Sequence, residues 1–202
     1  ELFTSEQDKV ITINPTFGMV DVYVKLFNLR NIRIGYDKKL NLNFNKLYKN
    51  ISKKISLIII ANPNSPTGTE IDHKKMMMIL KKSKNMNVPI IIDEAYYGFH
   101  KETYLHYTKK YPNLIVTRSF SKAFGLAGLR AGFVVSNKKT AQKIYNLKPM
   151  YEINSLSCEA IDFIIKRKNI LNNHVKSINM GRNYLISELK KLEIEYINTK
   201  TN

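Results

Sequence analysis

Cysteine is almost absent from this 202-residue chain, which contains Cys158 alone. A single cysteine excludes an intramolecular disulfide framework and is typical of a reducing compartment, so we expect a cytoplasmic protein. Long apolar runs are also missing, because the longest, Ile55–Ala61 and Val88–Ile92, are too short to cross a bilayer. The first residues are largely polar and do not resemble a signal peptide. We therefore predict no membrane partner.

Acidic residues are few: 16 Asp and Glu stand against 33 Lys and Arg, a formal net charge of +17. A balance this basic raises the question of nucleic-acid binding. The lysines, however, are spread along the whole length in pairs, without an Arg-rich or aromatic-interleaved run. We interpret them as lysines on solvated helix faces and predict no nucleic-acid partner. The positive electrostatic field of the protein would still attract anionic substrates.

Patterns for metal and dinucleotide binding are lacking as well. His73, His100, His106 and His174 show no ligand spacing with one another or with Cys158, so we predict no metal site. No Gly-x-Gly-x-x-Gly run occurs, which argues against a dinucleotide fold.

Strand-like and helix-like segments alternate along the chain. Strands are expected at 10–13, 32–34, 57–61, 88–93, 114–117 and 132–136, and helices at 19–28, 44–51, 72–85, 138–147, 155–166 and 170–192. This alternation predicts an α/β fold with a largely parallel, helix-covered sheet. Ile194–Ile197 is expected to begin a strand of another domain, and the polar start suggests a chain that begins inside a larger protein.

One lysine, Lys122, stands in a run of small and apolar residues just past the strand at 114–117. Open α/β sheets bind ligands at the carboxyl ends of their strands. A lysine buried there would have a lowered pKa and could form a Schiff base. Ser119, Ser121 and Arg130 offer hydroxyl donors and a charged fork that suit a phosphate. An aldehyde with a phosphate points to pyridoxal 5′-phosphate; the alternative is a solvated turn.

Asp93 ends an all-apolar strand, where a charge is costly unless it is paired. The ring nitrogen of a pyridoxal cofactor requires such a partner, and Tyr96 lies near enough to reach the phenolic oxygen. The alternative is that Asp93 caps the following loop.

Three motifs together resemble the class I/II (fold type I) pyridoxal-phosphate aminotransferases, most closely their histidinol-phosphate aminotransferase branch. They are Asn62–Gly68 (NPNSPTG), Ile92–Tyr96 (IDEAY) and Ser119–Arg130 (SFSKAFGLAGLR). They occur in order, with 27 residues from Pro66 to Asp93 and 29 from Asp93 to Lys122, spacings similar to the family's. The resemblance covers most of the chain.

The resemblance implies a three-layer fold with a mixed, mostly parallel sheet, and a role for each matching residue. Lys122 corresponds to the Schiff-base lysine and proton shuttle, Asp93 to the pyridinium partner and Tyr96 to the ligand of the phenolic oxygen. Ser119, Ser121 and Arg130 correspond to phosphate ligands, and Phe17 stands near the ring or the substrate. The family's usual asparagine before Pro-Thr-Gly is replaced by Ser65, so either Ser65 or Asn64 takes its place.

The resemblance also implies an incomplete enzyme. It divides the chain into a partial cofactor-binding large domain (1–150), a helical connection (151–192) and the start of a small domain (193–202). The family's Gly-Ser/Thr phosphate loop and a partner-subunit tyrosine would precede this chain, and the arginine that binds the substrate carboxylate would follow it. A homodimer with a shared active site is implied.

Two reactions remain open under this resemblance. Transamination between an amino acid or amino-phosphate and a 2-oxo acid such as 2-oxoglutarate is favoured. Decarboxylation of a phosphorylated amino acid uses the same cofactor residues. Outside this class, Ser119–Lys122 matches Ser-x-x-Lys of acyl-enzymes, but their Ser-Asp-Asn and Lys-Thr-Gly elements are missing. The non-enzyme alternative is a basic module that binds nucleic acid. Such a module would lack the visible absorption of a bound pyridoxal cofactor.

Overall fold

The computed structural model describes residues 2–199 and 201–202. Its strands are β1 (Lys9–Asn14), β2 (Arg30–Gly35), β3 (Leu57–Ala61), β4 (Ile90–Asp93), β5 (Leu114–Ser119) and β6 (Gly132–Val135). Its helices are α1 (Gly18–Leu26), α2 (Phe44–Asn50), α3 (His73–Asn85), α4 (Lys138–Leu147), α5 (Ser155–Ile165) and α6 (Lys168–Lys191). Two short 3₁₀ helices, η1 (Leu105–Lys109) and η2 (Ala127–Leu129), lie in the loops. The predicted elements up to residue 192 are present with small shifts at their ends.

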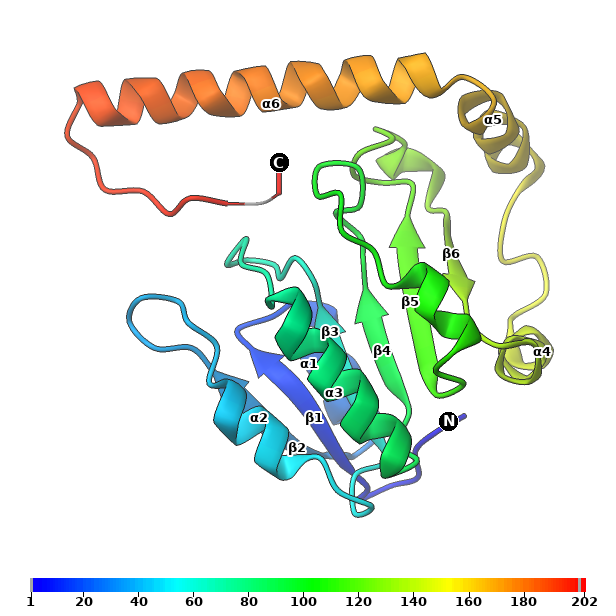
Figure 1. The fold of residues 1–202 in the computed structure, drawn as a ribbon. Coiled ribbons are helices and arrows are strands. Elements are labelled where there is room, and N and C mark those ends of the chain that lie inside the picture. Colours follow the sequence, from blue (N-terminus) through cyan, green and yellow to red (C-terminus); the bar gives the residue numbers. More distant parts are fainter. Residues whose placement is uncertain (1, 200) are drawn as a thin grey trace.

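All six strands form one sheet in the order β2-β1-β3-β4-β5-β6 (Figure 1). β1 to β5 run parallel, and β6 runs antiparallel to β5. Successive parallel strands are joined through helices or long loops on the faces of the sheet, as parallel pairing requires. The predicted α/β fold with a mixed, mostly parallel sheet is therefore confirmed.

The two faces of the sheet are covered by different helices. Ile58, Ile60 and Ile90 belong to the main core, together with Leu47 of α2 and buried residues of α3. The alternate strand positions face the other way and form a smaller cluster around Val24 of α1. Because neighbouring strand residues point to opposite faces, strands with apolar residues at both positions become the middle of three layers.

Helix α3 shows how local signals place an element on the sheet. Asp72 caps its first turn by accepting hydrogen bonds from the backbone nitrogens of Lys74 and Lys75, at 3.0 and 3.3 Å. The methionine run behind the cap is only partly core, because Met76 is fully buried while Met78 is 46% exposed. One face of α3 therefore packs on the sheet and the other meets solvent.

The last segment differs from the sequence-based expectation. Residues 193–199 form no helix or strand, so the predicted strand at Ile194–Ile197 is wrong. A strand needs a neighbour to pair with, and no described segment pairs with these residues. Helix α6 instead runs above the carboxyl ends of β4 and β5, and the tail returns beneath it (Figure 1). Within the described residues, no helix is long and apolar enough to span a membrane.

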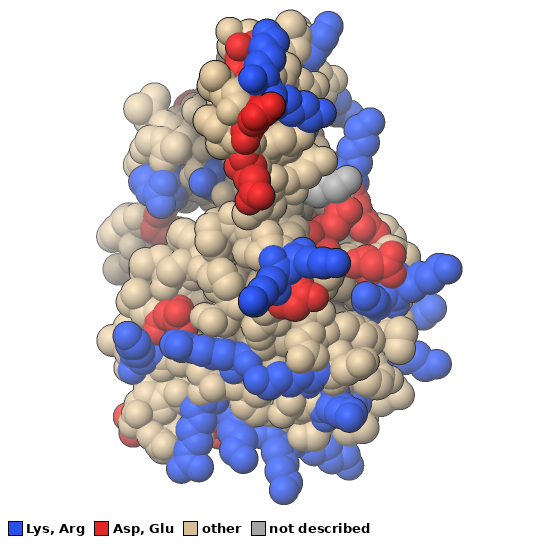
Figure 2. All heavy atoms as spheres, turned by 90° about the vertical axis from the view of Figure 1, so that its left-hand side faces the viewer, with Lys and Arg blue, Asp and Glu red and all other residues tan. Residues whose placement is uncertain are grey.

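Basic side chains are distributed rather widely on the surface. On the face seen in Figure 2, Lys and Arg are spread over most of the lower half, with uncharged surface between them. This pattern is the one expected of solvated lysines on helices and turns.

Candidate active site

The predicted site residues come together at one edge of the sheet. Asp93 ends β4 directly opposite Thr117 of β5, so the loops after both strands begin side by side. Tyr96 follows β4, and Lys122 follows β5. The other predicted residues follow β1 and β3 or precede the antiparallel β6, which places them at the same edge: Phe17, Asn64, Ser65 and Arg130. This edge faces α6 in Figure 1.

Asp93 is held in a fixed orientation through one of its oxygens. Oδ1 accepts hydrogen bonds from Thr117 Oγ1 at 3.0 Å and from the backbone nitrogen of Ala95 at 3.1 Å. Burial raises the pKa of Asp93, and these two hydrogen bonds oppose the rise. Oδ2 accepts no hydrogen bond from the described residues, so it remains available to a ligand.

Lys122 lies above the ring of Tyr96, with Nζ 5.4 Å from the ring centroid. The lysine was expected to be buried, and this expectation is wrong because its side chain is exposed. The small residues after it form an exposed loop and η2 instead of a cover over the amine. Its neighbour Ala123 is fully buried and anchors the loop.

A close backbone approach fixes the lysine loop against the loop after β4. Gly98 has a φ of +109°, and a Cβ built on it would lie 2.6 Å from the Cβ of Ala123. Any larger residue at position 98 would push the two loops apart. Gly98 therefore sets the distance between the segments that carry Tyr96 and Lys122.

The hydroxyls expected to bind phosphate form a local turn. The backbone nitrogen of Ser121 donates to Ser119 Oγ at 2.9 Å, and both serines are half-buried. Arg130 adopts the left-handed conformation, and its Nη1 donates to the carbonyl of Ala127 at 3.0 Å. Its exposed side chain borders a groove of about 760 Å³ lined mainly by β6 and α4. The structure shows no contact between Arg130 and the serines, so their joint role stays a prediction.

Asn64 and Ser65 have different environments. Asn64 is 2% exposed, and its amide donates to the carbonyl of Pro15 and to Thr67 Oγ1, both at 2.9 Å. Its Oδ1 accepts from Thr16 Oγ1, also at 2.9 Å. Asn64 therefore ties the loop after β3 to the loop before Phe17, which is 53% exposed. The side chain of half-buried Ser65 makes no hydrogen bond within the described residues.

Sequence reasoning did not identify a buried ion pair beside the site. Glu94 is 2% exposed and accepts from Nε and Nη2 of Arg118 at 3.0 and 2.9 Å. Thr103 Oγ1 and the Tyr104 backbone nitrogen also donate to Glu94, at 2.8 and 2.5 Å. The Arg118 guanidinium stacks 3.4 Å from the ring centroid of Tyr97. The sequence did contain a signal for this ion pair. Glu94 directly follows the predicted strand at 88–93, and Arg118 directly follows the predicted strand at 114–117.

A parallel sheet with a reversed last strand, and polar loops gathered at its carboxyl edge, is the fold of the type I pyridoxal-phosphate enzymes. The chain belongs to the aminotransferase class I and II family, whose sequence profile matches residues 1–202.

Relatives within this family include histidinol-phosphate aminotransferases. The one from Clostridium novyi is 36% identical over 202 residues, covering 99% of this chain and 56% of that protein. The solved histidinol-phosphate aminotransferase from Clostridium acetobutylicum is 25% identical with a TM-score of 0.89, covering 96% of this chain and 60% of that one.

A second solved neighbour, an L-threonine-O-3-phosphate decarboxylase from Porphyromonas gingivalis, is 19% identical with a TM-score of 0.80. That match covers 99% of this chain and 63% of that one, and it shows likeness of fold alone. The chain thus spans little more than half the length of its relatives.

Proposed function

We propose that this chain carries the cofactor-binding residues of a pyridoxal-phosphate-dependent aminotransferase. The enzyme would move an amino group between an amino acid or amino-phosphate, such as histidinol phosphate, and a 2-oxo acid such as 2-oxoglutarate. The observation that supports this most is Asp93, a buried carboxylate with one open oxygen at the edge of the sheet that also presents Lys122.

The residues at this edge fit the cofactor. A buried carboxylate with a raised pKa gains most from a cation placed against its open oxygen, and a protonated ring nitrogen is such a cation. Lys122 has no ion-pair partner among the described residues, so its amine is available for a covalent bond. When bound, pyridoxal phosphate supplies an electron sink for the substrate's Cα.

Each residue has a defined task under this proposal. Asp93 holds the ring nitrogen protonated, and Lys122 Nζ binds the cofactor and later moves the proton at Cα. Tyr96 and Ser65 bind the phenolic oxygen, because the amide of Asn64 is already occupied within the chain. Phe17 offers an exposed ring for stacking. Ser119, Ser121 and Arg130 bind the phosphate.

The complete protein is proposed to be a cytoplasmic homodimer with a shared active site. The outer side of α1 supports an interface, because it exposes a row of large apolar side chains: Met19, Val22, Tyr23 and Leu26. The proposed division remains a partial large domain at 1–150, a helical connection at 151–192 and the start of a small domain at 193–202. The helices α5 and α6 occupy the connecting segment.

The alternative reaction is decarboxylation of a phosphorylated amino acid, which the same cofactor residues would support. Glu152, after α4, pairs with Lys148 at 3.2 Å and is exposed. This pairing favours a solvated role for Glu152 and does not distinguish the reactions. Assaying the complete protein with histidinol phosphate, phosphoserine and phosphothreonine, for 2-oxoglutarate-dependent turnover and for released carbon dioxide, separates them.

Lys122 provides the test of the cofactor assignment. Borohydride should fix the cofactor to the complete protein, and peptide mapping should find the label on Lys122. The Lys122→Ala variant should retain some cofactor without the covalent link and lose activity. Exposed Lys54, in the loop before β3 at the opposite edge of the sheet, is the matched control, and Lys54→Ala should still be labelled on Lys122. A label on another lysine in the unaltered protein would refute the assignment.

A further inference from the structure

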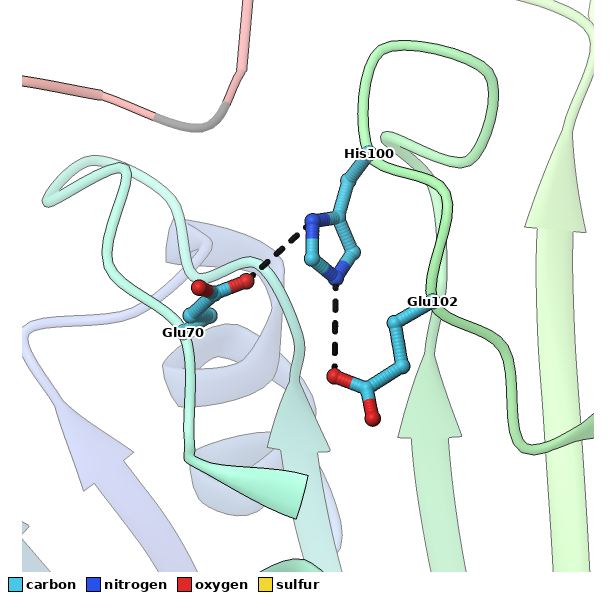
Figure 3. Close-up of side chains that lie close together, drawn as sticks. All are labelled: Glu70, His100 and Glu102. Atoms are coloured by element: carbon cyan, nitrogen blue, oxygen red, sulfur yellow. Dashed lines mark ion pairs between the residues drawn. The ribbon is translucent and has the colours of Figure 1, made fainter.

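Glu70, from the loop after β3, meets His100 and Glu102, which are both in the loop after β4 (Figure 3). His100 lies between two carboxylates, with Nδ1 3.1 Å from Glu70 Oε2 and Nε2 3.9 Å from Glu102 Oε2. One ligand-type atom from each residue lies within 4.8 Å of those of the other two. The cluster therefore has the dimensions of a small cation site.

The two ring nitrogens of His100 have different surroundings. Nδ1 is close enough to Glu70 to donate a hydrogen bond, which would leave the lone pair on Nε2. Nε2 is buried and has no hydrogen-bond partner among the described residues. Its distance of 3.9 Å from Glu102 is too long for a hydrogen bond. Two ligand atoms of one tetrahedral zinc ion lie about 3.3 Å apart. A small rotation of the Glu102 side chain would therefore allow Nε2 of His100 and Oε2 of Glu102 to bind the same ion.

Glu102 is held in place by His73, which contacts the carboxylate oxygen that does not face His100. Its Oε1 contacts Nδ1 of His73, the first residue of α3, while Nε2 of His73 lies 3.5 Å from the hydroxyl of Tyr107. The second oxygen of Glu102 is the one directed at His100. Carboxylates that hold the free N–H of a ligand histidine are a common outer shell of metal sites, and Glu70 has this position here.

We propose that His100 Nε2 and Glu102 bind a divalent transition-metal ion such as zinc, with Glu70 and His73 as the residues that orient them. Imidazole and carboxylate suit zinc, and water completes the coordination because Glu102 is partly exposed. Both ligands lie on the loop that follows Tyr96, and the contact of His100 Nδ1 with Glu70 joins this site to the loop that follows Ser65. The sequence predicted no metal site, because the histidines show no ligand spacing with one another or with Cys158, and Glu70 meets His100 only after folding.

The proposal is independent of the aminotransferase reaction and is tested by metal binding. The complete, untagged protein is stripped with EDTA, freed of excess cofactor and titrated with zinc by calorimetry. One zinc per chain should bind, and the melting temperature should rise because the ion binds only the folded state. Cobalt in place of zinc should give visible ligand-field absorption.

Variants assign the site. His100→Gln and Glu102→Gln should each lose zinc binding and the rise in melting temperature. Glu70→Gln should bind zinc roughly 10–100-fold more weakly, as loss of an outer-shell partner does. His106→Gln is the matched control, since His106 is exposed on η1, and it should bind like the unaltered protein.

If the unaltered protein takes up no zinc, or if both His100→Gln and Glu102→Gln bind it normally, the cluster is an ion pair only and the proposal is wrong. Circular dichroism of each variant separates loss of the site from loss of the fold.

Discussion

Asp93 affects stability and cofactor binding in opposite directions. Burial raises its pKa in the folded chain above the ordinary value of 3.8. Its contribution to stability is therefore full below that ordinary value, which applies to the unfolded chain, and is lost as the pH rises through the folded pKa. Above the folded pKa, the buried ionised carboxylate destabilises the cofactor-free protein, and a cationic ring nitrogen would relieve this cost.

Replacing Asp93 with asparagine should therefore separate stability from function. In Asp93→Asn, the side-chain oxygen can still accept from Thr117 and Ala95, while the charge is gone. We expect a higher melting temperature for the cofactor-free protein at pH 7 and a much smaller gain at pH 4. We also expect activity to fall by orders of magnitude, because the charge-assisted bond to the ring is lost. Normal turnover with cofactor bound would show that Asp93 is only a loop cap.

The buried pair of Glu94 and Arg118 should be critical for stability. Arg118→Met leaves Glu94 buried without its counter-ion, which should cost about 3–5 kcal/mol in free energy of unfolding. The double variant Glu94→Gln, Arg118→Met should be less destabilised than Arg118→Met alone. The control is Arg33→Met, whose pair with Asp21 at 3.1 Å is 49% and 40% exposed, so its loss should cost under ~1 kcal/mol. Urea unfolding measures all three, and equal losses would contradict the argument.

At the scale of elements, the loop after β3 combines structural and ligand-binding residues that are adjacent in sequence. Asn64→Ala removes two hydrogen bonds that join this loop to the loop after β1 and a third within the loop, and it should lower the melting temperature. Ser65→Ala removes no hydrogen bond within the described residues, so stability should hold while cofactor affinity falls. Thermal melts and cofactor titration of both variants test this. A stable Asn64→Ala with weak cofactor binding would reverse the two roles.

At the scale of the whole molecule, we expect the proposed reaction to require groups beyond these residues. The resemblance places a phosphate-binding loop, a partner tyrosine and a carboxylate-binding arginine outside these residues. Lys122 is also exposed in the chain by itself. We expect the isolated 202-residue polypeptide to bind pyridoxal phosphate weakly and not to transaminate, while the complete protein dimerises and does both.

Light scattering and a coupled glutamate assay on both polypeptides check this expectation. Turnover by the isolated chain at the rate of the complete protein would show that the site needs nothing beyond these residues.

The sequence by itself determined most of the strands and helices, and it determined which edge of the sheet carries the site residues. Apolar runs such as Leu57–Ala61 favour buried strands, Asp72 is a residue type that caps helices and caps α3, and alternating strands and helices favour a parallel sheet. In a parallel sheet, residues that follow adjacent strands must share one edge. This is why Asp93, Tyr96 and Lys122 could be placed together before the fold was known.

Only the tertiary structure decided the interactions that depend on pairing at a distance. Which loops pack together decides three features of the site. These are the exposure of Lys122, the hydrogen bonds that occupy the side chain of Asn64, and the pairing of Glu94 with Arg118. The absence of a strand at Ile194–Ile197 depends on whether a neighbour pairs with it. The cluster of Glu70, His100 and Glu102 likewise forms from two loops whose side chains meet only after β3 and β4 pair. Local sequence fixes backbone preferences, whereas burial and side-chain partners are properties of the packed chain.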